Sequence, residues 1–220
     1  MPGRRRPASH THGADATRQH ISREAARIMA EEGVRDFRIA KRKAAERLNL
    51  PETRHLPSNQ EVEQALAEHL QLFHAKDLPQ TLQHLRRLAV EAMRLLERFE
   101  PRLVGSLLSG NVTRFSEIQL HVAADTPELV AFFLQEHGIP YEETSKRLRF
   151  GGDRSEMVPV YGFQAGDTTI EVSVFNPKAA REAPLSPVDG LSMKRAPLKE
   201  VEALLETGPA LPPALPKYRL

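Results

Sequence analysis

Two short stretches of the chain combine residue types that could hold a polyphosphate and a divalent cation. The first is Gly105-Ser106, which follows an apolar pair, and the second carries Glu117 and Gln119. A glycine at a strand end lets the backbone approach a phosphate, and a serine adds a hydroxyl beside the amides of a helix start. Positions two apart on a strand point to the same face. Two acids so placed can bind Mg²⁺ ions that bridge nucleotide phosphates and activate a hydroxyl.

The surrounding residues predict the elements that would position these groups. Ile118, Leu120 and Val122 alternate with polar residues, which indicates a half-buried strand. Thr168–Phe175 alternates in the same way after a Gly166-Asp167 hairpin turn. Further patterns predict a strand at Leu103-Val104, a helix that Thr126 caps and that contains Leu129–Leu134, strands at Leu148–Phe150 and Val158–Phe163, and a last helix at Leu198–Leu205.

The order of these residues resembles the signature of the nucleotidyltransferase superfamily, the DNA polymerase beta-like fold. That signature is an apolar residue, Gly-Ser or Gly-Gly, a spacer, and then Asp-apolar-Asp-apolar on a strand. A third acid on a neighbouring strand completes the family's metal site, and Glu171 matches that position. The resemblance covers about a third of the chain, residues 102–176. It implies an NTP such as ATP and Mg²⁺ as ligands.

On this resemblance the expected catalytic residues are Glu117 and Glu171, the expected metal ligands are Glu117, Gln119 and Glu171, and the expected nucleotide-binding residues are Gly105, Ser106 and Arg114. The chain departs from the family at Gln119, which stands where the second aspartate is expected. An amide oxygen can coordinate Mg²⁺, but it brings no negative charge to the site. The sequence therefore favours a degenerate nucleotide-binding or regulatory module over an active enzyme.

Two alternatives remain open. The first is an active Mg²⁺-dependent enzyme that moves an NMP from an NTP to an unknown hydroxyl acceptor. The second is a helical protein-interaction module with a purely structural sheet, in which Glu117, Gln119, His121 and Glu171 face solvent. His121 lies two residues after Gln119 and could also contact a phosphate or a metal.

The first half of the chain has helical periodicity instead. Apolar residues recur at helical spacing from Thr17 to Gly33, over Val34–Leu48, after a capping box formed by Ser58 and Glu61, and from Pro79 to Phe99. We therefore expect an α+β protein, with an N-terminal helical region followed by a nucleotidyltransferase-like mixed β-sheet flanked by helices. The expected divisions are a disordered tail (1–14), a helical region (15–100), the nucleotidyltransferase-like domain (101–206) and a Pro-rich tail (207–220).

Charge is unevenly distributed along the chain. Residues 1–54 carry 13 Lys and Arg against 7 Asp and Glu, although the whole chain has a net charge of only +2. A basic helix spans Arg35–Arg47 and could bind a nucleic acid or a protein. Its cations could equally pair with acids of the chain itself, with Glu97, Glu100 and the Glu128–Glu143 region as the expected partners.

Composition narrows the class of protein. The 220 residues are 40% hydrophobic, which is enough for a packed core, and they include no Cys. A thiol nucleophile, a disulfide framework and Cys-ligated metals are thereby excluded. No apolar run approaches the ~18–20 residues of a membrane span, and no apolar stretch follows the basic N-terminus as in a secretory signal. We expect a cytoplasmic protein without membrane association.

Overall fold

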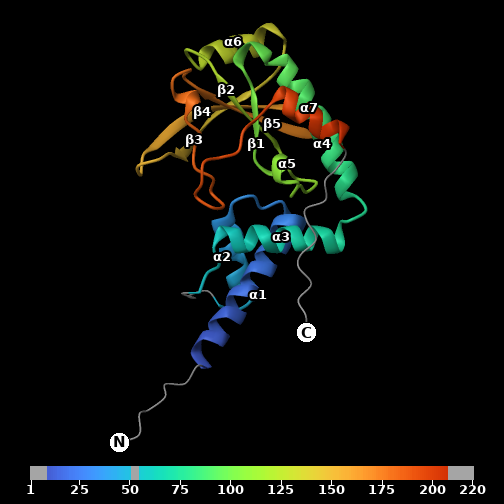
Figure 1. Cartoon of the computed structure of the whole chain (residues 1–220), viewed down its shortest axis with the longest axis vertical. Coiled ribbons are helices and arrows are strands. Elements are labelled where there is room, and N and C mark those ends of the chain that lie inside the picture. The colour runs from blue at the N-terminus through green and yellow to red at the C-terminus, as the bar shows by residue number, and fades with distance from the viewer. Residues whose placement is uncertain (1–8, 51–54, 208–220) are drawn as a thin grey trace, which may run out of the picture. The chain divides into compact units, whose positions relative to one another are not determined.

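The computed structural model describes residues 9–50 and 55–207 (Figure 1). The chain divides into two compact units between His74 and Ala75, and each unit is described here by itself. The first unit is helical. The second contains a six-stranded mixed sheet flanked by helices, so the expected α+β class is confirmed.

Three helices make up the described part of the first unit: α1 (Ser9–Glu32), α2 (Phe37–Arg47) and α3 (Asn59–Phe73). Both α2 and α3 pack against α1 through fully buried apolar residues such as Ile21, Ile28, Ala44 and Val62. α1 begins at Ser9, so part of the tail expected at residues 1–14 is helical, because the helix of residues 17–32 continues towards the N-terminus. The rest of that tail, and residues 208–220 of the Pro-rich tail, lie outside the described residues.

Local side-chain bonds fix the starts of α2 and α3. The Asp36 carboxylate accepts a hydrogen bond from the Ile39 amide at 2.8 Å. Ser58 and Glu61 form the capping box that the sequence predicted: the Ser58 hydroxyl accepts from the Glu61 amide, and the Glu61 carboxylate accepts from the Ser58 amide. Such caps pair amides that the first helical turn leaves without partners.

The second unit begins with α4 (Leu78–Leu95), which the sequence assigned to the helical region. After a single 3₁₀ turn, η1 (Glu97–Phe99), the chain enters the sheet. Its strands are β1 (Arg102–Val104), β2 (Ile118–Ala123), β3 (Glu142–Arg149), β4 (Ser155–Ala165), β5 (Thr168–Phe175) and β6 (Ala196–Pro197). Their spatial order is β3-β4-β5-β2-β1-β6. β2 and β5 run parallel at the centre, and every other neighbouring pair is antiparallel.

One face of the sheet carries the larger apolar core. Leu103, Leu120 and Val122 are at most 2% exposed, as is Val172. Three helices flank the sheet: α4, α6 (Glu128–Glu136) and α7 (Leu198–Glu206) (Figure 1). A shorter helix, α5 (Ser106–Ser109), follows β1 directly. The guanidinium of Arg86 on α4 is 4% exposed and donates to the carbonyls of Leu107 on α5, at 3.2 Å, and Leu204 on α7, at 3.4 Å. Arg86 therefore links α4 to both α5 and α7.

The opposite face of the sheet carries polar residues of the central strands, among them Gln119, His121 and Glu171. A smaller apolar cluster of Phe150, Val158 and Phe175 lies on this side, with Leu148 and Ala180 packed against it. A 3₁₀ turn, η2 (Ala179–Arg181), contacts β2 here. Arg195 donates to the carbonyls of Ala180 and Arg181 and so ties the segment just before β6 to this turn.

Two local expectations were wrong. β3 begins at Glu142, six residues before the expected strand, and it forms a long ribbon with β4. The N-cap of α6 is Pro127, not Thr126, because the chain already has helical backbone angles there. No helix in the described part of the chain has both the length and the hydropathy that a membrane crossing requires.

Candidate functional site

The register of the central strands brings Gly105, Gln119 and Glu171 together. Gln119 on β2 lies opposite Val104 on one side and Glu171 of β5 on the other. Because directly opposite residues of paired strands share a face, Gln119 and Glu171 point to the same side of the sheet. Gly105 follows Val104 immediately and is the N-cap of α5. These three residues therefore come from three separate segments and meet at one place.

Gly105 occupies a conformation that its neighbours require. Its φ is +79° and its ψ is −152°, a combination that residues other than glycine rarely adopt. A Cβ at this position would lie 2.6 Å from Oε1 of Gln119. The absence of a side chain at Gly105 is thus what allows Gln119 to lie against the turn between β1 and α5.

Glu171 is the centre of a small polar network. Nε2 of Gln119 donates to Oε2 of Glu171 at 3.2 Å, and the ammonium of Lys146 forms an ion pair with the same oxygen. The side chain of Glu171 is 17% exposed, and that of Lys146 is 41% exposed. Lys146 lies on β3, and sequence analysis did not connect it with this site.

This donor set does not fit the Mg²⁺ site that the family resemblance implies. A divalent cation needs oxygen ligands with free lone pairs, preferably from charged carboxylates. Here Oε2 of Glu171 already accepts from an ammonium and an amide, and Gln119 turns its N–H towards Glu171 rather than its oxygen. Among the residues that the structure describes, no three His, Asp or Glu side chains form a group that could hold a metal ion.

The other expected site residues flank this network. Ser106 begins α5, and its carbonyl accepts from the Gly110 amide at 2.8 Å. Glu117 is half-buried and lies just before the first residue of β2. Arg114 is exposed, with its guanidinium 4.6 Å from the ring centre of Phe115. Gly105, Gln119 and Glu171 thus lie side by side, and Ser106 follows Gly105 along the chain.

His121 is buried on the same face rather than exposed. Its register neighbours are Arg102 on β1 and Ser173 on β5, and its ring lies 4.7 Å from that of Phe175. The residue is 5% exposed, and Nδ1 has no hydrogen-bond partner within the described part of the chain. Burial first, and then the charges of Arg195 and Lys146, lower the pKa of His121 to about 4.

Three cations therefore gather on this face of the sheet. Arg102 lies opposite His121, Lys146 pairs with Glu171, and Arg195 reaches over from the segment that follows η2. Burial first, and then the charge of Arg102, lower the pKa of Arg195. No periodic pattern could have identified Arg195, because it lies in an irregular segment.

Comparison with models of protein families, with curated proteins and with solved structures finds no match for this chain.

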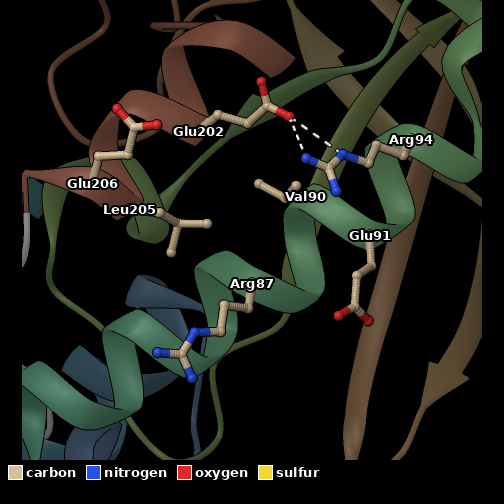
Figure 2. Close-up of a pocket in the computed structure, with 7 residues that line it drawn as sticks. All are labelled: Arg87, Val90, Glu91, Arg94, Glu202, Leu205 and Glu206. Atoms are coloured by element: carbon tan, nitrogen blue, oxygen red, sulfur yellow. Dashed lines mark hydrogen bonds and ion pairs between the residues drawn. The ribbon is translucent and has the colours of Figure 1, made fainter.

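A hollow lies apart from these residues, between α4 and α7 (Figure 2). Its volume is about 420 Å³, and its lining consists of Arg87, Val90, Glu91, Arg94, Glu202, Leu205 and Glu206. Arg94 spans it, with Nη2 2.7 Å from Oε1 of Glu202. The lining charges are mixed and largely balanced, so they favour no single class of ligand.

The basic helix is partly neutralised within its own unit. Arg47 pairs with Glu32 at 2.6 Å and with Glu24 at 3.3 Å, while Lys43 lies 3.7 Å from Glu32. Lys41 donates to the carbonyl of Pro57 and to Asn59, and burial lowers its pKa. The acids that pair with this helix across the unit are thus those of α1. Binding of a nucleic acid or a protein by this helix stays a prediction.

Proposed function

We propose that this chain is a nucleotidyltransferase-like protein that acts as a degenerate nucleotide-binding or regulatory module. The expected phosphate-binding glycine, the neutral Gln119 and the expected third acid lie side by side, which supports the kinship of the site. The ion pair between Lys146 and Glu171 supports its degeneracy. This ion pair is the observation on which the proposal depends.

The ammonium of Lys146 neutralises the Glu171 carboxylate, which in the family would bind a metal ion. Because Gln119 is neutral, a bound Mg²⁺ would find little negative charge to offset the loss of its water ligands. It would also have to displace Lys146. The site therefore lacks the arrangement that two-metal catalysis needs, in which two ions stabilise the attacking and leaving oxygens.

The cations of this face favour an anion. Arg102, Lys146 and Arg195 lie close to Glu171 and His121 on this face. The acids of the face are Glu171, the neighbouring Glu117 and, further out on β3, Glu142. A cluster of cations beside a helix start attracts phosphate groups through charge and through donated hydrogen bonds. A nucleotide would thus bind by its phosphates, with Gly105 and Ser106 at the turn, and without a metal.

The first test is nucleotide binding by the full chain. We expect ATP, GTP, CTP or UTP to raise the melting temperature in a concentration-dependent way that EDTA does not reduce. Lys146→Met should weaken this binding by about tenfold, because Glu171 then loses its counter-charge. Lys199→Met, at an exposed position on α7, is the matched control and should leave binding unchanged.

Two results would contradict the proposal. One is the absence of a melting shift with all four nucleotides. The other is Mg²⁺-dependent transfer of a labelled NMP by the unmodified chain, lost in Glu117→Ala, which would support the active enzyme instead.

The second test measures whether Gln119 and Lys146 are the residues that prevent the site from binding Mg²⁺. The double variant Lys146→Met/Gln119→Asp places two carboxylates side by side and removes the ammonium. We expect Mg²⁺ to raise the melting temperature of this variant and to leave that of the unmodified chain unchanged.

Adding Glu171→Gln to the double variant should abolish the gain, since it removes one carboxylate without changing the shape of the side chain. Circular dichroism establishes that each variant is folded. If Mg²⁺ raises the melting temperature of the unmodified chain equally, Lys146 and Gln119 do not prevent metal binding.

A further inference from the structure

β3 is the outermost strand on one side of the sheet. It pairs with β4 along its whole length (Figure 1). At the end of the other edge, the carbonyl of Arg149 accepts a hydrogen bond from the amide of Leu185 at 2.6 Å. Over residues 142–148 no other strand of the described chain pairs with this edge. An edge strand of eight residues presents a row of backbone N–H and C=O groups that another strand can bind. The part of this edge before Arg149 is therefore available for pairing with another chain.

The charges of β3 are divided between its two halves. Glu142 and Glu143 lie in the first half, and Lys146, Arg147 and Arg149 lie in the second. Glu143 and Arg147 are both exposed, and neither forms an ion pair with any residue that the structure describes. Many other charged residues of the chain, such as Arg47 and Arg154, are paired.

We propose that two copies of this chain associate through antiparallel pairing of their β3 edges, centred on Ser145. In a two-fold arrangement of antiparallel strands, one residue lies opposite its own counterpart. With Ser145 in that place, Glu143 of each copy lies opposite Arg147 of the other. The pairing thus forms two opposite-charge pairs on one face of a continuous sheet.

The structure favours this register over its neighbours. Centring on Thr144 would place Glu142 opposite Lys146, but Lys146 is already paired with Glu171. A parallel, in-register arrangement would place Glu143 opposite Glu143 and Arg147 opposite Arg147, which is repulsive. Unlike these two arrangements, the antiparallel register centred on Ser145 pairs Glu143 with Arg147 and leaves the Lys146 contact in place.

Charge reversal tests this register directly. Sedimentation of the full chain over a concentration series should show a monomer–dimer equilibrium. Glu143→Arg and Arg147→Glu should each weaken the dimer by about tenfold or more, because each replaces attraction by repulsion at both pairs. The double variant Glu143→Arg/Arg147→Glu should recover it. A mixture of the two single variants should form a heterodimer, since each then supplies the charge that the other lacks.

A cysteine provides a second measurement. Because the chain contains no Cys, Ser145→Cys carries a single thiol that faces its own counterpart in the proposed register. We expect it to form an intermolecular disulfide under mild oxidation much faster than Ser192→Cys, an exposed control after β5. A chain that stays monomeric at all concentrations, or a dimer that neither single reversal weakens, would overturn the proposal. Equal rates of cross-linking by the two cysteine variants would also overturn it.

Discussion

Gly105→Ala is expected to lower the free energy of unfolding by about 3 kcal/mol, a large effect for the addition of one methyl group. The backbone at Gly105, with φ +79° and ψ −152°, lies in a region that is nearly exclusive to glycine. In addition, the new Cβ would lie 2.6 Å from Oε1 of Gln119, well inside the normal contact distance. Urea unfolding followed by circular dichroism measures the loss.

The two causes can be separated. In a Gln119→Ala background the clash is removed and the backbone strain remains, so the cost of Gly105→Ala should fall to about 1–2 kcal/mol. Gly138→Ala is the matched control, because Gly138 also has a positive φ of 65° but has no atom within 4 Å of its added Cβ. If Gly105→Ala costs no more than Gly138→Ala, the close approach of Gln119 to Gly105 is wrong.

His121 is expected to make the folded state less stable as the pH falls. Burial lowers its pKa from 6.5 to about 4, and the cations Arg195 and Lys146 act in the same direction. The unfolded chain therefore takes up a proton at this residue before the folded chain does. The contribution of His121 to the free energy of unfolding is therefore full above pH 6.5. It decreases by about 3 kcal/mol in total as the pH falls to about 4.

Unfolding measured from pH 7.5 down to pH 4 in the unmodified chain and in His121→Phe tests this expectation (the pH values span the titration of His, ~6.5). The variant replaces the imidazole by a ring that does not titrate and that can pack against Phe175. It should lack most of the loss seen between pH 6.5 and 4. His84→Phe, at an exposed position on α4, should retain it. Parallel pH profiles for the unmodified chain and His121→Phe would show that His121 is not buried in the neutral form.

The elements with strong local signals were predictable from the sequence. Ser58 and Glu61 correctly predicted the start of α3, and Gly166-Asp167 correctly predicted the hairpin before β5. β3 was largely missed, because most of its residues are exposed and alternate in no apolar pattern. A strand of this kind is held by backbone pairing with β4, which a single sequence does not reveal.

Some residues of the candidate site were also expected from the sequence, whereas others were missed. The family resemblance implied that Gly105, Gln119 and Glu171 lie at neighbouring strands, and the structure brings these three side by side. Their roles in binding stay predictions. Lys146 was missed because its strand was missed, and the burial of His121 depends on Phe175, more than fifty residues away in the sequence.

The parallel pairing of β2 with β5 has a consequence for the order of folding. β3, β4 and β5 follow one another through short turns, so their contacts close small loops early. Gln119 and Glu171 are 52 residues apart, and bringing them together costs the entropy of a much longer loop. That cost is offset only when β2 inserts between β1 and β5. The Lys146–Glu171 ion pair belongs to the early ribbon, whereas the polar site as a whole exists only once the last central strand is in place.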